Sequence, residues 1–287
     1  MQFLDVKTDY AFKKVFGSKE SKDILISFLN ALLYNESNIK IKDLTIADPY
    51  NIPMIKGVKD TFVDVKATLD NNTTVIIEMQ VLNHKGFEKR VLYNAAKNYS
   101  IQLNKSEDYH LLNPVIALSI VDFNMFKDSD KTINRFKLIE KETLIDYGGD
   151  IELVFIELPK FKQTLDELKN IKDEWIYFVK NAGSLEYIPQ NLNEKIKIAL
   201  ESINEANLSK DELEAQHKRK EFISIQRLAV LKADEDGFEK GMEKGLEEGE
   251  KKKAIEIAKN LLDVLDDETI SLKTDLDVQT IKNLRVK

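Results

Sequence analysis

Apolar residues at helical spacing mark the first elements of the chain. Ala11, Val15 and Phe16 lie on one side of a short predicted helix, and Gly17 is suited to end it. Leucine, isoleucine and phenylalanine then recur every three or four residues over 24–33, which predicts a second amphipathic helix. The chain therefore opens with two helices, each of which has an apolar face to bury.

Beyond residue 61 the spacing of apolar residues changes to a period of two. One face of the predicted strand 62–69 carries Phe62, Asp64, Lys66 and Thr68, and the other carries Val63, Val65, Ala67 and Leu69. The sequence DNNT at 70–73 is typical of a turn, and the β-branched run at 75–77 begins another strand. We therefore expect a β-hairpin.

The following segments alternate between helical and strand patterns. A helix is predicted over 85–103, buried strands over 113–123 and 151–159, and helices over 173–182 and 191–206. Ser209 and Glu212 form a capping-box pattern for one more helix, and no strand pattern follows residue 208. We expect an α/β domain over 1–185, a helical extension over 186–235 and a helical tail over 236–287.

Glycines recur every four residues in the predicted tail, at positions 237, 241, 245 and 249. An interior helix glycine costs about 1 kcal/mol relative to alanine, so such a stripe needs a compensating contact or marks a frayed, solvated helix. The stripe would allow two helices to touch closely. Two interpretations remain open, a solvated linker helix and a surface for self-association into a homo-oligomer.

Composition excludes several classes of protein. The chain has 287 residues, no cysteine and three histidines, which leaves neither a disulfide scaffold nor a thiolate zinc site. No apolar run approaches the roughly 20 residues that span a bilayer. The first residues, MQFLDVKTDY, carry charges where a signal peptide needs its apolar core, so we expect a soluble, cytoplasmic protein with no membrane contact. The net charge of -7 means that any contact with nucleic acid must come from a local basic patch.

Two acidic residues of the predicted hairpin are candidates for chemistry. Asp64 lies in the first strand, while Glu78 lies in the apolar sequence IIEMQV of the second and shares a face with Gln80. A buried, unpaired carboxylate is costly, so Glu78 needs a metal ion, a cation or hydrogen-bond donors. Magnesium suits such a site because it is commonly held by one or two carboxylates.

The length of the hairpin loop decides whether the two acids meet. An odd number of loop residues centred on Asn71 would set Asp64 opposite Glu78, whereas a two-residue loop at Asn71 and Asn72 would set Asp64 opposite Met79. The sequence favours neither loop. In the simpler alternative, Asp64 and Glu78 only pair with lysines such as Lys66.

An acidic residue, a turn and an apolar strand that ends Glu-x-Gln together resemble the PD-(D/E)XK nuclease motif. The wider chain resembles the bacterial branch of that superfamily known as recombination-promoting nucleases or transposases. The matching segments are TDYAFKKVFG, VDVKATLDNNTTVIIEMQV, FEKRVLYNAAKNY, YHLLNPVIALSIVDF, IELPKF, WIYFVKN and the glycine-spaced tail. The resemblance implies a restriction-endonuclease-like mixed β-sheet flanked by helices and followed by a mainly helical C-terminal region.

The resemblance also implies roles for individual residues. Asp64 and Glu78 correspond to the magnesium ligands, with manganese able to substitute, and Asp9 corresponds to an acid of the first helix that often joins the metal shell. Gln80 stands where the superfamily has lysine, and glutamine supplies no positive charge, although it can orient the attacking water. Lys66 is a candidate for part of the missing charge. Asp9 is equally explained as a first-turn acid favoured by the helix dipole.

Three residues of the helix after Glu78 are candidates for contact with nucleic acid. Arg90, Tyr93 and Lys97 occupy positions i, i+3 and i+7, so one helix face would present them to phosphate. In the alternative, Tyr93 is a core residue and the two cations form a solvated face.

These residues favour a magnesium-dependent DNA endonuclease associated with recombination or mobile DNA. RNA is an alternative substrate, since nothing in the sequence reads a 2′-hydroxyl. The alternative function is that of a degenerate nuclease fold that acts as an oligomeric interaction or scaffold module.

Overall fold

The computed structural model describes residues 1–35, 37–51 and 61–285. Its contacts divide the chain into two units, Met1–Ile223 and Ser224–Lys287. The boundaries expected at 185 and 235 remain predictions.

The first unit is built on a six-stranded mixed sheet with the order β1-β4-β5-β6-β8-β7. The strands β5, β6 and β8 are parallel, and the other pairs of this sheet are antiparallel. Its strands are β1 Leu44–Ala47, β4 Val65–Leu69, β5 Thr74–Gln80, β6 Val115–Val121, β7 Ile133–Phe136 and β8 Ile151–Glu157, and the small pair is β2 Tyr50–Asn51 with β3 Thr61–Phe62.

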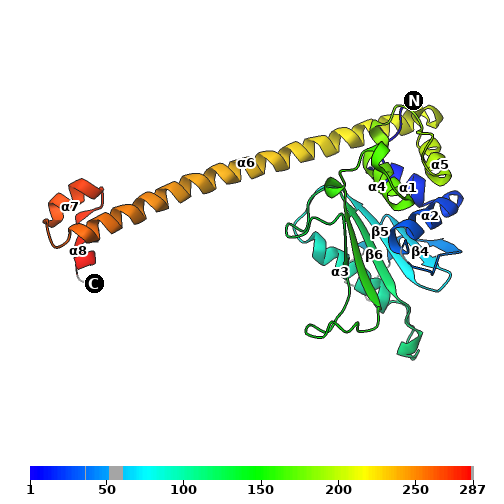
Figure 1. Cartoon of the computed structure of the whole chain (residues 1–287), viewed down its shortest axis with the longest axis horizontal. Coiled ribbons are helices and arrows are strands. Elements are labelled where there is room, and N and C mark those ends of the chain that lie inside the picture. The colour runs from blue at the N-terminus through cyan, green and yellow to red at the C-terminus, as the bar shows by residue number, and fades with distance from the viewer. Residues whose placement is uncertain (36, 52–60, 286–287) are drawn as a thin grey trace. The chain divides into compact units, whose positions relative to one another are not determined.

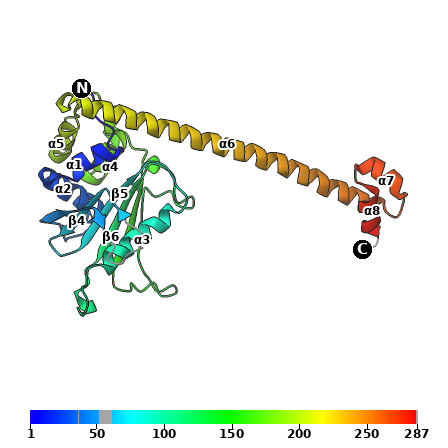
Figure 2. The same cartoon turned by 180° about the vertical axis from the view of Figure 1, so that it is seen from behind.

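Helices cover both faces of this sheet, as Figures 1 and 2 show from opposite sides. One face packs against α1, α2, α4 and α5, and the other packs against α3. The bounds of these helices are α1 Asp9–Phe16, α2 Lys22–Leu33, α3 Phe87–Ser100, α4 Ile171–Asn181 and α5 Glu194–Ser202. Single 3₁₀ turns occupy Lys19–Ser21, Tyr109–Leu111, Leu158–Lys160, Leu165–Glu167, Ala182–Ser184 and Glu205–Asn207. This arrangement confirms the expected restriction-endonuclease-like α/β fold.

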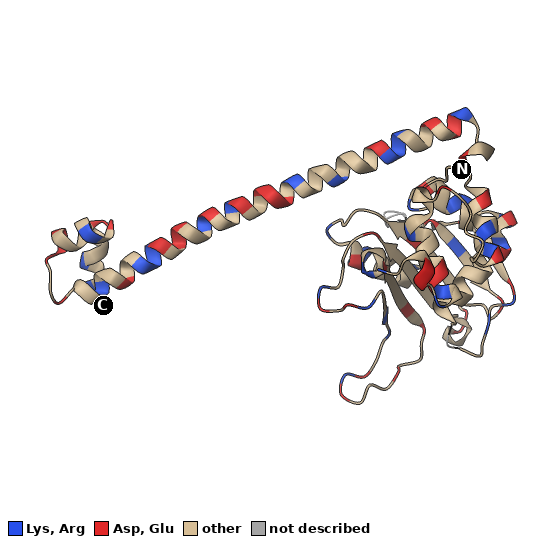
Figure 3. Ribbon diagram, turned by 45° about the horizontal axis from the view of Figure 1, so that its top comes forward, with Lys and Arg blue, Asp and Glu red and all other residues tan. Residues whose placement is uncertain are grey.

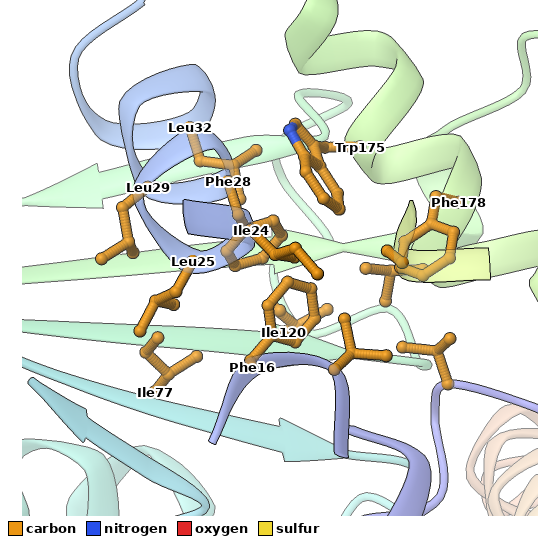
Figure 4. Packing of buried hydrophobic residues seen from close by; sticks show 14 of the residues in the cluster. Phe16, Ile24, Leu25, Phe28, Leu29, Leu32, Ile77, Ile120, Trp175 and Phe178 are labelled. Atoms are coloured by element: carbon orange, nitrogen blue, oxygen red, sulfur yellow. The ribbon is translucent and has the colours of Figure 1, made fainter. Parts of the chain in front are cut away.

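Aromatic rings hold the first two helices against α4 (Figure 4). The ring centroid of Phe16 lies 4.4 Å from that of Phe28 and 5.9 Å from that of Trp175, and all three side chains are buried. Such contacts contribute about 0.5–1.5 kcal/mol per pair beyond the buried area. Because Phe16 ends α1, this cluster fixes the helix whose first turn carries Asp9.

The hairpin loop has the odd length that brings the two acids together. Val65 pairs with Ile77, and the N–H of Leu69 donates to the carbonyl of Thr73, which leaves the three-residue loop 70–72. Asn72 has φ +64°, the left-handed conformation that closes such a loop and that asparagine tolerates. Continued by one residue, this register sets Asp64 opposite Glu78.

The expected alternation over 62–69 is wrong at Asp64. Val63 packs with the core beneath α3, whereas Val65, Ala67 and Leu69 pack with the core on the other face. The chain bends at Asp64, which lies just before β4. Pairing between β4 and β5 therefore ends at Val65, and in the described part of the chain no strand pairs with the last residues of β5 on that side.

The second unit consists of helices. The helix α6 spans Lys210–Leu261, begins in the first unit and continues through the glycine-spaced sequence, and α7 Asp267–Thr274 and α8 Val278–Arg285 follow it. Ala258, Ile270, Leu276 and Ile281 form a small core among these helices. Lysine and glutamate alternate along much of α6 (Figure 3). No helix in the described part of the chain is both long and apolar enough to cross a membrane.

Candidate active site

The carboxylate of Asp64 occupies the place that β4 vacates beside β5. Its Oδ2 accepts a hydrogen bond of 2.7 Å from the N–H of Met79, and its own N–H donates to the carbonyl of Ile77. The side chain of Asp64 thus satisfies a backbone donor that a longer β4 would have satisfied. The bend in the chain is what directs this carboxylate to the end of β5.

A second carboxylate arrives from the first helix. Thr8 caps α1, because its hydroxyl accepts from the N–H of Ala11, and Asp9 is the first residue of the helix. Asp9 is hydrogen-bonded to Asp64 through the side chains. Lys13, one turn later, places its Nζ 3.0 Å from Asp9 Oδ1 and 4.0 Å from Asp64 Oδ1. Asp9, Asp64 and Lys13 form the first half of the site.

The beginning of α6 supports this half from outside. The hydroxyl of Tyr10 donates to the carboxylate of Glu212, and Thr8 Oγ1 lies 3.2 Å from Gln216 Oε1. Both contacts lie within the first unit. They restrain the first turn of α1 and therefore the position of Asp9.

The second half of the site faces α3. Glu78 and Gln80 both accept hydrogen bonds from the guanidinium of Arg90, with 2.6 Å between Arg90 Nη2 and Gln80 Oε1. The side chain of Glu78 is only 16% exposed. Burial raises the pKa of Glu78, and the positive charge of Arg90 opposes that rise.

The electrostatics of Asp64 join the two halves. Burial, the hydrogen bond with Asp9 and the charges of Asp9 and Glu78 raise the pKa of Asp64 to about 7, against the opposing effect of the hydrogen bond from Met79 N–H. The negative charges of Asp9 and Glu78 therefore act on a side chain of Asp64 that is only 17% exposed. Lys13 and Arg90 supply only part of the positive charge that would balance these carboxylates.

The donor set fits a hard divalent cation. Among the described residues no group of three or more histidine, cysteine, aspartate or glutamate side chains has the geometry of a metal cage. Magnesium does not require one, since it binds through one or two carboxylates and retains several waters. The crowding of Asp64 by Asp9 and Glu78 is the observation that matches such an ion, with Asp64 and Glu78 as the residues that would hold it.

The residues predicted for phosphate contact do not share one accessible face. Lys97 is buried, at 7% exposure, whereas Tyr93 is 42% exposed. Arg90 is turned toward Glu78 and Gln80. The expectation of a shared face is therefore wrong for Lys97, because the side of α3 on which it lies packs against the sheet.

Sequence reasoning assigned part of the missing positive charge to Lys66 and overlooked Lys13. In the structure the charge that acts on Lys66 is that of Asp48, and Lys13 is the lysine beside Asp64. The spacing of Asp9 and Lys13 at i and i+4 on a helix was the available signal, since such pairs lie side by side.

We expect the metal-free protein to lose stability as pH rises toward and through about 7. The pKa of Asp64 is about 7 in the folded chain, against an ordinary value of 3.8. Folding therefore favours the protonated carboxyl, and the stability that this preference contributes is complete below about pH 4 and is lost as the pH rises through about 7. Urea denaturation at pH 5 and pH 8 should show a smaller decline in the free energy of unfolding for Asp64→Asn than for the unchanged chain. An identical decline in both proteins would contradict the assignment.

Comparison with known proteins assigns the chain to a family. No curated protein and no solved structure matches the chain. The sequence profile described as PD-(D/E)XK nuclease family transposase matches residues 6–232, which include both halves of the site and every strand of the sheet. The chain therefore belongs to the PD-(D/E)XK nuclease family transposases.

Proposed function

We propose that this protein is a magnesium-dependent endonuclease that hydrolyses phosphodiester bonds of DNA, in the context of recombination or mobile DNA. The observation that carries the proposal is the convergence of Asp9 and Glu78 on Asp64, a carboxyl whose pKa is raised first by burial and then by these two neighbours. A divalent cation would relieve this concentration of acidic groups. The family supports a nuclease-like or transposase-like function.

In the proposed reaction water adds to phosphorus and the bond from phosphorus to one ester oxygen breaks. The leaving oxygen takes up a proton, and the water loses one. Asp64 and Glu78 would hold magnesium, whose chemistry when bound would be that of a Lewis acid that polarises the phosphate and makes water easier to deprotonate. Asp64 and Glu78 hold their carboxylates at the end of β5 through the bend before β4 and the contact with Arg90.

The test is cleavage of supercoiled plasmid DNA by the full chain. Cleavage should require added magnesium, stop with a chelator and resume when magnesium or manganese is restored. A single-stranded RNA of matched length, offered in parallel, separates DNA from RNA as the substrate. Absence of cleavage on both substrates, together with no heat of magnesium binding, would favour the scaffold function instead.

We also propose that copies of this chain associate through α6. A shallow, mostly apolar surface of this helix is formed by Met242, Gly245, Leu246 and Gly249 together with two charged residues. A Cβ atom added at any of the four spaced glycines would meet nothing within 4 Å, so another helix has room to approach. Phe238, one turn before Met242, is 72% exposed and extends the apolar stripe.

We expect the double variant Phe238→Glu with Met242→Glu to be a monomer in solution. Two carboxylates in an apolar helix contact lose their hydration without gaining partners, which disfavours association. Multi-angle light scattering measures the mass, and Lys244→Glu, on the opposite side of α6, is the control that should retain the oligomer. A monomeric unchanged chain at micromolar concentration would reject association through α6.

A further inference from the structure

The residue at the lysine position of the motif is hydrogen-bonded to an arginine. Gln80 Nε2 donates to the carbonyl of Leu82 at 2.7 Å, which orients the amide so that Oε1 points toward Arg90. Arg90 Nη2 lies 2.6 Å from that oxygen and also donates to Glu78. A guanidinium therefore lies beside the strand position where the superfamily carries its lysine ammonium.

The helix α3 holds this guanidinium in place. Its first residue, Phe87, is buried, and the Arg90 guanidinium carbon lies 5.2 Å from the centroid of the Phe87 ring. Gly86 precedes the helix with φ +84°, a conformation that glycine adopts without strain, and its carbonyl accepts the N–H of Arg90. Arg90 is therefore positioned by its helix, by an aromatic ring and by two residues of β5.

Arg90 retains the capacity to contact a substrate. Its side chain is 42% exposed, although it touches the buried end of β5. A guanidinium has five N–H donors, and the contacts with Glu78 and Gln80 both use Nη2. The remaining donors can form the paired hydrogen bonds that arginine makes with phosphate oxygens.

We propose that Arg90 replaces the lysine of the motif as the cation that stabilises charge on the scissile phosphate, and that Gln80 is the positioning residue that directs it. This inference rests on the proposed nuclease function. It assigns to Gln80 the orientation of a side chain rather than of a water molecule. Lys13 does not fill this role, because its contacts are with Asp9 and Asp64, in the other half of the site.

The test restores a lysine at the motif position. Arg90→Ala should lower kcat for plasmid cleavage by about 10²-fold, the effect of removing one donor to a developing oxyanion. Gln80→Leu should cause a loss of the same order, and the double variant Arg90→Ala with Gln80→Leu should lose little more. Gln80→Lys in the Arg90→Ala background should recover at least about tenfold in kcat, because an ammonium at position 80 then stands next to the place of the lost guanidinium.

Matched measurements separate this role from a structural one. Lys89→Ala removes one positive charge from the neighbouring, exposed position of α3 and should leave kcat unchanged. Circular dichroism identifies any variant that has lost its fold, and a structural role for Arg90 would not respond to Gln80→Lys. Provided that the unchanged chain cleaves DNA, three results would overturn the inference. They are an undiminished kcat in Arg90→Ala, an effect of Arg90→Ala on KM alone, and a folded Arg90→Ala protein that Gln80→Lys does not rescue. If the unchanged chain does not cleave either, the proposed function itself is overturned.

Discussion

Asp64→Asn and Glu78→Gln should each lower magnesium-dependent DNA cleavage by at least about 10²–10³-fold. Both substitutions preserve the size and the hydrogen-bonding shape of the side chain. In Asp64→Asn the amide oxygen can still accept the hydrogen bond that the carboxylate receives from the N–H of Met79. What each variant loses is the negative charge that a divalent cation requires.

Calorimetry with magnesium gives a second readout for the same variants. Because two carboxylates are proposed to hold the ion, its binding heat should fall in both variants, while thermal unfolding of the metal-free chain should show no loss of fold. Glu88→Gln is the matched control, since Glu88 is exposed on the first turn of α3 and should leave both cleavage and heat unchanged. Full cleavage by both variants would reject the assignment of the site.

Local sequence patterns predicted the order of helices and strands but not the length of the hairpin loop. Amphipathic spacing predicted α1, α2 and α3, and alternation predicted the pairing of β4 with β5. The choice between an odd and an even loop needed the conformation of Asn72, which a sequence with two consecutive asparagines does not determine. Local patterns therefore predicted the hairpin, while backbone geometry decided its register.

The parts of the site that escaped prediction depend on contacts between distant segments. The bend at Asp64 lies just before β4 begins, where the Asp64 side chain accepts the hydrogen bond from the Met79 N–H, and no local pattern signals it. The burial of Lys97 follows from how α3 lies on the sheet, which a helical wheel does not specify. Arg90 was expected to contact phosphate, and only the folded chain shows its hydrogen bond with Gln80.

Phe28→Ala should destabilise the first unit by about 3–5 kcal/mol, the usual cost of removing a buried phenylalanine ring. Phe28 is 1% exposed, and its ring contacts those of Phe16 and Trp175 at centroid distances of 4.4 and 5.5 Å. The substitution would remove the ring contact between α2 and Phe16 at the end of α1, the helix that carries Asp9 and Lys13.

Fluorescence of Trp175 in urea measures this change, because it is the one tryptophan of the chain and lies within the first unit. The free energy of unfolding should fall for Phe28→Ala and stay within about 0.5 kcal/mol of the unchanged chain for Tyr187→Ala, whose side chain is exposed. Cleavage should decline together with the folded fraction. A loss of less than about 1 kcal/mol in Phe28→Ala would mean that the site does not depend on this aromatic cluster, because α1 would then be held mainly by its contacts with the beginning of α6.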